Sequence, residues 1–150
     1  MKKTFVLGIY GNSNTGKTNL MIDLIKHYKE KGFKVATLKI TDKNIAFDKP
    51  GKDTFKHGEA GSDLVTFSSS IETVFLIKEK QTINNIISNI SNFDYYDIIF
   101  VEGANDKKTP KIRIGDITER ENTICTYYGD FLRLINIITE KMNERVDKNE

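Results

Sequence analysis

Short runs of β-branched and aromatic residues alternate along the chain with stretches whose apolar residues recur at helical spacing. The runs predict strands at residues 4–10, 33–40, 64–67, 73–77, 98–101, 111–114 and 123–127. The helical spacing predicts apolar helix faces within residues 20–28, 83–90 and 131–142. Strands that alternate with helices predict an α/β domain whose sheet is mainly parallel and flanked by helices.

Turn-forming and polar residues mark the ends of these elements. The first helix is expected to end at Gly32, after a lysine-rich last turn. Residues 41–52 are expected to form a polar loop, and Asp53 is a candidate cap for a short helix that runs towards Gly61. The last few residues of the chain are expected to fray.

The sequence pattern predicts different degrees of burial for the later strands. Residues 98–101 are apolar without interruption, as in a strand that is buried on both faces. The strands at 111–114 and 123–127 are expected to lie late in the chain and at edges of the sheet. The pattern does not determine the strand order.

Composition narrows the class of protein. The 150 residues are the length of one domain, and 23 Lys and Arg against 21 Asp and Glu leave a net charge of +2. That balance argues against nonspecific binding to nucleic acid, which needs a dense basic face. One cysteine, Cys125, excludes an intramolecular disulfide and is expected to be a buried thiol. No apolar run reaches the ~18–20 residues of a membrane span, so we expect a cytoplasmic protein with no membrane association.

The first predicted strand is followed by a match to the phosphate-loop pattern G-x-x-x-x-G-K-[ST]. Its glycines let backbone N–H groups point at phosphate oxygens, its lysine reaches the outer phosphates, and its hydroxyl joins the Mg²⁺ shell. The helix that follows adds the positive end of its dipole. The predicted nucleotide-binding residues are Gly11, Asn12, Ser13, Asn14, Thr15, Gly16, Lys17, Thr18 and Asn19.

Two acidic residues, Glu102 and Asp42, are candidates to bind the metal or orient water beside these phosphates. Ligands of open α/β sheets bind beyond the carboxyl ends of the strands, which favours Glu102 over Asp97 because Asp97 enters the same strand at its other end. We expect Glu102 and Thr18 to hold Mg²⁺, and Glu102 or Asp42 to position water beside Lys17. The alternatives are that Glu102 ends a strand or pairs with a lysine, and that Asp42 lies in a solvated loop.

Together these segments resemble the family of MobB proteins, which serve molybdopterin-guanine dinucleotide biosynthesis. The resemblance covers residues 5–114. Its most specific part is the segment D-K-P-G-K-D-T at residues 48–54, which is similar to the family pattern D-x-P-G-K-D-[ST]. Further matches are His57 with Glu59-Ala60-Gly61, Val101-Glu102-Gly103 and Pro110-Lys111-Ile112.

The resemblance implies a P-loop NTPase-like fold and a role in molybdenum or tungsten cofactor maturation. It implies a protein that binds GTP, hydrolyses it slowly with Mg²⁺ and acts as a homodimer. Its partner would be the guanylyltransferase-type enzyme that attaches GMP to molybdopterin. By the same resemblance residues 11–18 hold the GTP phosphates, Glu102 lies near the metal and residues 48–54 line the crevice.

The chain departs from the family pattern at two places. After the second strand the family has a His-rich stretch of K-H-x-H-H type, whereas residues 39–43 here contain no histidine. Ala104-Asn105 replaces the family's F-K after V-E-G. Residues 105–108 also differ from N-K-x-D, by which many GTPases read guanine. The preference for GTP therefore rests on the resemblance alone.

A second ligand, such as molybdopterin, needs its own anion-binding groups. Two lysines beside the rigid Pro50-Gly51 turn suit an anion, and a basic segment past Glu102 can pair with a phosphate. Solvated loops are the alternative in both places. The candidates are Lys49, Lys52, Asp53, His57, Lys108 and Lys111, whereas His27 is expected to be an exposed surface residue.

The primary hypothesis is a GTP-binding accessory protein of molybdopterin dinucleotide synthesis, with weak Mg²⁺-dependent GTPase activity. No arginine lies in or beside the phosphate loop, so intrinsic turnover is expected to be slow. Two alternatives remain: a non-catalytic adapter that needs nucleotide only for its shape, and a small-molecule kinase. Against the kinase, the sequence shows no arginine-rich lid insertion.

Overall fold

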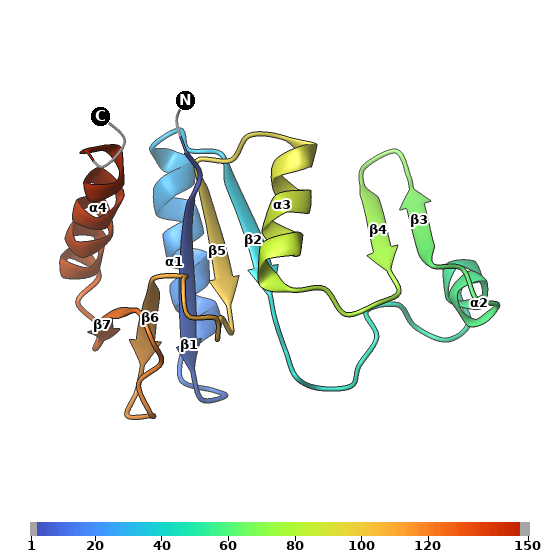
Figure 1. Cartoon of the computed structure of the whole chain (residues 1–150), viewed down its shortest axis with the longest axis horizontal. Coiled ribbons are helices and arrows are strands. Elements are labelled where there is room, and N and C mark those ends of the chain that lie inside the picture. The colour runs from blue at the N-terminus through green and yellow to red at the C-terminus, as the bar shows by residue number, and fades with distance from the viewer. Residues whose placement is uncertain (1–2, 148–150) are drawn as a thin grey trace. The chain divides into compact units, whose positions relative to one another are not determined.

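A five-stranded parallel sheet forms the centre of the larger part of the molecule. The computed structural model describes residues 3–147. The sheet has the order β2-β5-β1-β6-β7, and every neighbouring pair is parallel (Figure 1). The strands are β1 (Phe5–Gly11), β2 (Val35–Lys39), β5 (Ile98–Glu102), β6 (Lys111–Ile114) and β7 (Thr123–Tyr127). The predicted α/β class with a parallel sheet is confirmed.

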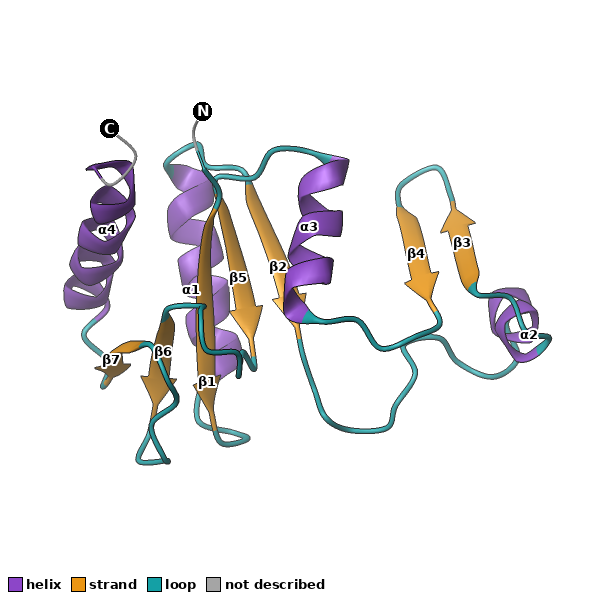
Figure 2. Ribbon diagram, viewed as in Figure 1, coloured by secondary structure: helices purple, strands orange, loops and turns teal. Residues whose placement is uncertain are grey.

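Helices cover both faces of this sheet (Figure 2). Helices α1 (Lys17–Glu30) and α4 (Phe131–Asp147) pack on one face, where Leu24 and Ile138 join strand residues such as Leu7 in the main core. Helix α3 (Ile83–Phe93) places Ile87 and Ile90 against a smaller core on the other face. The residues of β5 from 98 to 101 alternate between the two cores and are completely buried, as predicted.

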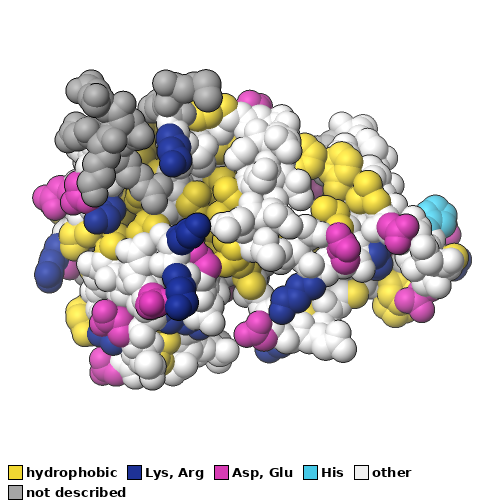
Figure 3. Space-filling model, in the orientation of Figure 1, with side chains coloured by type: hydrophobic (Ala, Val, Ile, Leu, Met, Phe, Trp, Pro, Cys, Tyr) yellow, Lys and Arg dark blue, Asp and Glu magenta, His cyan; other side chains and the backbone are white. Residues whose placement is uncertain are grey.

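Residues 42–85 form a second unit with its own contacts, separate from residues 1–41 and 86–150. It contains helix α2 (Asp53–Glu59) and an antiparallel hairpin of β3 (Leu64–Ser68) and β4 (Thr73–Ile77). Val65 is buried in this unit, whereas Leu64, Phe75 and Ile77 on the alternate strand positions are 45–50% exposed. Figure 3 shows hydrophobic side chains at the surface over this hairpin. The prediction of a single nucleotide-binding domain over residues 1–150 stays a prediction.

Two local expectations are corrected by the structure. Of the two late strands only β7 lies at an edge of the sheet, because β6 is inserted between β1 and β7. Asp53 is the first residue of α2 rather than its cap: Lys52 occupies the cap position with no side-chain capping bond, and the Asp53 carboxylate lies 3.5 Å from the Lys56 ammonium. The expected fraying of the last residues falls at 148–150, outside the described residues.

None of the helices in the described part of the chain is long and apolar enough to cross a membrane.

Candidate functional site: a phosphate loop at the carboxyl edge of the sheet

The phosphate loop connects β1 to α1 through backbone conformations that few residues adopt. Gly16, at the helix cap position, has φ of 92°, and Asn14 has φ of 60°, both in the left-handed region. The Thr15 hydroxyl donates to the Asn12 carbonyl at 2.7 Å and closes the turn. The first turn of α1 has no side-chain cap and no acidic residue. Its N–H groups are therefore available to an anion.

Two glycines beside the loop allow neighbouring backbones to approach closely. A Cβ on Gly11 would lie 2.7 Å from the Ile114 carbonyl oxygen, a distance that side-chain carbons do not adopt. A Cβ on Gly103 would lie 2.5 Å from the Ile40 carbonyl oxygen, and Gly103 also has φ of 88°. Glycine at these two positions lets the ends of β1, β5 and β6 and the segment after β2 come together at one edge of the sheet.

A cavity of about 490 Å³ opens at this edge. The Lys17 ammonium donates to the carbonyls of Gly11 at 2.8 Å and Asn12 at 2.5 Å, and has no carboxylate partner among the described residues. The Glu102 side chain is only 15% exposed and its carboxylate lies 3.7 Å from the Lys39 ammonium. The cavity is lined by Ser13, Asn14, Gly16, Lys17, Thr18, Asn19, Lys39 and Glu102.

This arrangement suits a polyphosphate with a divalent cation. Two lysines face one glutamate, so the cavity carries a net positive charge that favours anions. The Thr18 hydroxyl and the Glu102 carboxylate are oxygen ligands of the kind that Mg²⁺ takes. The described residues hold no cluster of three or more His, Cys, Asp or Glu side chains that would bind a metal by themselves. That fits Mg²⁺, which is usually bound by one or two protein oxygens together with substrate phosphates and water.

Several predicted site residues lie in the second unit. All of them are exposed, and the roles predicted for them in catalysis or in binding a second ligand stay predictions. These residues are Asp42, Lys49, Lys52, Asp53 and His57.

The segment D-K-P-G-K-D-T has a local structural role. A hydrogen bond from the Thr54 hydroxyl, the backbone N–H of Lys49 and the charges of Lys52 and Lys78 together hold the pKa of Asp48 below its ordinary value. Gly51, with φ of 96°, completes the turn between Asp48 and Thr54. Part of this motif therefore shapes its own loop.

Lys111 is a correction to the list of second-ligand candidates. Its side chain is completely buried, and its ammonium donates to the carbonyls of Asp106, Thr109 and Glu121. All three of its donors are used inside the protein, so no N–H remains for a phosphate. Lys108, by contrast, is exposed.

Two further expectations concern single side chains. His27 is half-buried rather than exposed, with its ring edge-on to Tyr28 at 5.1 Å and to Phe131 at 5.8 Å between centroids. Cys125 is partly buried and packs against the main core. Burial raises the pKa of its thiol, although the charge of Arg133 opposes this effect.

No motif of the sequence indicates the network of contacts that Arg120 makes next to the segment after Glu102. The Arg120 guanidinium lies 4.7 Å from the centre of the buried Tyr10 ring and donates to the Ala104 carbonyl at 2.7 Å. The Tyr10 hydroxyl pairs with the Thr123 hydroxyl at 2.6 Å and accepts the backbone N–H of Arg120 at 3.0 Å. This network joins the segment after Glu102 to the loop between β6 and β7.

Comparison with known families identifies the chain. The family model for molybdopterin guanine dinucleotide synthesis protein B, MobB, matches residues 6–140. The chain belongs to the MobB family. The match includes the phosphate loop, the 48–54 segment and the strand that ends at Glu102.

Curated relatives agree with this assignment over part of their length. A provisionally named molybdopterin-guanine dinucleotide biosynthesis adapter protein of Methanocaldococcus jannaschii is 31% identical over 67% of this chain and 41% of its own. The adapter proteins of the same name from Haemophilus influenzae and Escherichia coli are 29% and 27% identical, over 71% and 67% of this chain. The alignments with these two span 61% and 59% of the relatives' length.

Solved structures of MobB share the fold. Bacillus subtilis MobB aligns with a TM-score of 0.68 and 16% identity, over 89% of this chain and 96% of that one. Another structure, of molybdopterin-guanine biosynthesis protein B, aligns with a TM-score of 0.64 and 21% identity, over 93% and 99% of the two chains.

Proposed function

We propose that this protein is a nucleotide-dependent adapter of molybdopterin-guanine dinucleotide biosynthesis that binds GTP with Mg²⁺ and hydrolyses it slowly. The observation that carries this proposal is the cavity in which Lys17, Thr18 and Glu102 meet at the start of α1. Membership of the MobB family and the adapter names of the relatives support the pathway. The preference for guanine rests on the family.

Each residue of the cavity has a distinct role in this proposal. The backbone N–H groups of residues 13–18 cradle the phosphates, and Lys17 exchanges its carbonyl contacts for the outer phosphate oxygens. The Thr18 hydroxyl and the Glu102 carboxylate hold Mg²⁺, which supplies positive charge to the same oxygens. Glu102 orients the attacking water.

Slow hydrolysis of GTP is expected because the described residues that line the cavity include no arginine. Developing negative charge on the transferring phosphoryl group is therefore met only by lysines, N–H groups and the metal. An arginine supplied to such a site accelerates hydrolysis by about 10³–10⁵. The isolated protein should therefore hydrolyse GTP far below the roughly 1–100 per second of kinases.

The assignment of a second ligand belongs to the same proposal. Lys49 and Lys52, beside the Pro50-Gly51 turn, are proposed to contact the phosphate of molybdopterin. The exposed Lys108 is a separate candidate for such a contact. The partner is proposed to be the guanylyltransferase-type enzyme that attaches GMP to molybdopterin. A homodimer is proposed as the working form, which the exposed apolar hairpin of the second unit supports.

Calorimetric titration with Mg-GTP and Mg-ATP tests the site. Lys17→Ala should weaken binding of both nucleotides at least tenfold, because it removes the charge aimed at the outer phosphates. Lys26→Ala, an equal charge change at an exposed position of the same helix, is the matched control and should bind like the wild type. Equal, weak binding by all three proteins would contradict the nucleotide site.

A reconstituted cofactor-loading assay with the partner enzyme separates the GTPase from the adapter. Loss of both hydrolysis and loading in Lys17→Ala would support a role for the nucleotide cycle. Loading that survives without hydrolysis would instead show a scaffold. Transfer of phosphate to a metabolite above the hydrolysis background would favour a kinase.

A further inference from the structure

We propose that the base of the bound nucleotide lies over the carboxyl ends of β6 and β7, where Asp116 selects guanine and Tyr128 stacks on the ring. This inference rests on the proposed function, because it concerns the base of the nucleotide whose phosphates occupy the loop. Neither residue belongs to a motif of the chain or lines the phosphate cavity.

The strand order indicates on which side of β1 the nucleoside of the bound nucleotide would lie. From β1 the chain passes outwards to β2 and returns to β5, and it then crosses to β6 and β7 on the other side of β1. The order therefore reverses beside β1, and the loops after β1 and β6 leave in opposite directions. Open α/β sheets bind ligands in the crevice that such a reversal creates.

At the carboxyl edge of the sheet, the two sides of β1 differ in chemistry. On the β5 and β2 side lie Glu102 and Lys39, the groups assigned to the metal and the outer phosphates. The ribose and base must then extend past Gly11 towards β6 and β7. Strand register places Gly11 beside Ile114 and Ile114 beside Tyr127. The end of β7 is therefore two strand spacings, about 9.6 Å, from the end of β1, a span that a nucleoside can bridge.

The loop after β6 begins directly against the phosphate loop. The Ile114 carbonyl packs on Gly11, and a Cβ on Gly115 would lie 4.0 Å from the Thr15 methyl carbon. Gly115 has φ of 78°, so the chain turns sharply at this point, and Asp116 follows the turn directly. Asp116 is exposed.

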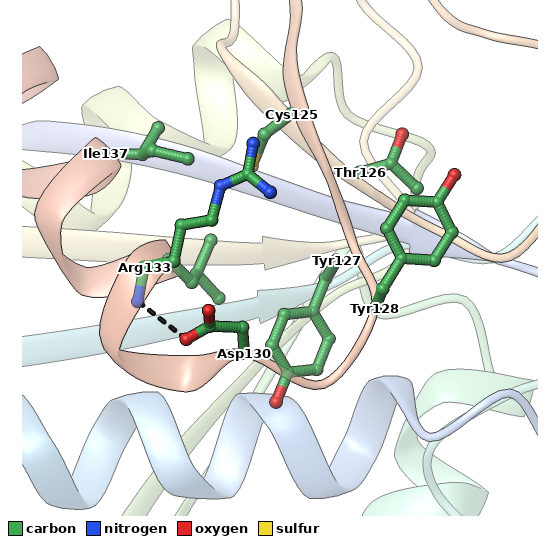
Figure 4. Close-up of a pocket in the computed structure, with 8 residues that line it drawn as sticks. Cys125, Thr126, Tyr127, Tyr128, Asp130, Arg133 and Ile137 are labelled. Carbon is green, nitrogen blue, oxygen red and sulfur yellow. Dashed lines mark hydrogen bonds between the residues drawn. The ribbon is translucent and has the colours of Figure 1, made fainter.

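Residues 115–130 contain four acidic side chains, and three of them have partners within the protein. Glu119 pairs with Arg113 at 3.9 Å and Glu121 with Lys107 at 3.7 Å. The Asp130 carboxylate accepts the backbone N–H of Arg133 at 3.0 Å and caps α4, as the dashed line in Figure 4 shows. Asp116 makes no hydrogen bond or ion pair with any residue that the structure describes.

The two tyrosines at the end of β7 divide between core and surface. Tyr127 packs against the main core, whereas Tyr128 is 76% exposed. In Figure 4 their rings point in different directions, and that of Tyr128 lies on the side of the chain away from Arg133. A large exposed ring at the rim of a nucleotide crevice can stack on a base, and stacking tolerates any base because each has a π face.

A carboxylate at this position distinguishes guanine from adenine by hydrogen-bond polarity. Guanine presents two donors along one edge, N1–H and the 2-amino group, which a carboxylate accepts together. Adenine presents an acceptor at N1, which repels the carboxylate and leaves it unpaired. Such a paired contact discriminates roughly 5- to 150-fold between bases. It would supply the guanine selectivity that residues 105–108, without N-K-x-D, do not explain.

Titration of GTP, ATP and XTP into the full chain with Mg²⁺ tests the proposal. The wild type should prefer GTP over ATP, and Asp116→Ala should remove most of that preference by weakening GTP binding, while ATP affinity does not fall. Asp116→Asn should gain XTP binding, because an amide N–H can donate to the 2-oxo group of xanthine. Tyr128→Ala should weaken GTP and ATP alike, and Tyr128→Phe should restore both. Asp23→Ala, an exposed acid on α1, is the control.

The outcomes separate this inference from the proposed function. If GTP binds to the wild type and Lys17→Ala abolishes binding, the phosphate site stands. Unchanged GTP-to-ATP ratios in both Asp116 variants would then overturn the base site alone. Equal affinity of the wild type for GTP and ATP would also overturn it. The gain of XTP binding is a positive signal that an unfolded variant cannot produce.

Discussion

At the scale of single residues, the Asp106 carboxylate organises the loop that follows β5. It accepts the backbone N–H of Lys108 at 3.0 Å, the N–H of Thr109 at 2.8 Å and the Thr109 hydroxyl at 3.0 Å. Burial by itself raises the pKa of Asp106, but these donors and the charge of Lys111 hold it below its ordinary value. The charged form is therefore the one that the fold prefers.

Asp106→Ala should lower the free energy of unfolding by about 1–3 kcal/mol at neutral pH, because hydrogen bonds to a charged group are lost. Since the folded pKa is depressed, this contribution is complete above the unfolded pKa of about 3.9 and disappears as pH falls through the folded pKa. Urea unfolding at a series of pH values should show the gap between wild type and variant narrowing in acid. Asp23→Ala is the exposed control, and a gap that does not change with pH would contradict the assignment.

Lys111 is buried at a position where the sequence pattern predicts an exposed lysine. In the sequence it belongs to a basic segment with Lys107, Lys108 and Arg113, which indicates a surface that attracts anions. In the structure its ammonium is buried among three carbonyls of the loops on either side of β6. The carbonyls of Asp106 and Thr109 lie within five residues of Lys111, and that of Glu121 lies ten residues away, but backbone carbonyls leave no mark in the sequence pattern that would identify them as partners.

At the scale of elements, the start of α1 is the part of the site that depends most on backbone. Its first turn lacks a cap and an acidic residue, so several N–H groups have no partner within the helix. A bound polyphosphate supplies these acceptors and also opposes the positive end of the helix dipole.

Mg-GTP should slow hydrogen exchange of the amides of residues 13–19 by about tenfold or more, because those amides become donors to phosphate. The amides of β3 and β4 should exchange as before, since that hairpin belongs to the other unit. Exchange measured by mass spectrometry on overlapping peptides checks both statements. The slowing should be absent in Lys17→Ala, and equal slowing in the two segments would count against a local phosphate site.

The elements themselves follow closely from the amino-acid pattern. The run at residues 98–101 predicts a strand buried on both faces, and the structure buries all four side chains. The positions of β3 and β4 are also predicted, but their separation into a hairpin is not. Strand pairing depends on partners distant in the chain, whereas strand formation depends on the residues of the strand itself.

At the scale of the whole molecule, the second unit is the part least able to bury its own apolar surface. Its hairpin has two strands, and isolated hairpins of that size are marginally stable in water. Leu64, Phe75 and Ile77 are exposed on the alternate positions, as is Ile71 at the turn. These side chains supply an apolar surface for the proposed homodimer.

Sedimentation velocity should show a dimer for the wild type and a shift to monomer for Ile77→Asp, because a charge on the hairpin face carries a desolvation cost in an interface. Leu132→Asp, an equal change at a 77% exposed position of α4, is the control and should stay dimeric. Far-UV circular dichroism checks that both variants are folded. A wild type that sediments as a monomer at all concentrations would disprove the homodimer.

The class of fold, the positions of most elements, the phosphate loop and the family resemblance can all be predicted from the amino-acid pattern. These features depend on residues that are close along the chain, such as the spacing of the loop glycines and the period of the apolar positions. The internal position of β6, the burial of Lys111, and the cavity that Glu102 and Lys39 share with the phosphate loop are visible only in the folded protein. Asp116 and Tyr128, in the segments that follow β6 and β7, are both exposed. The physical reason is that burial and pairing are set by segments that are distant in sequence and adjacent only after the sheet has formed.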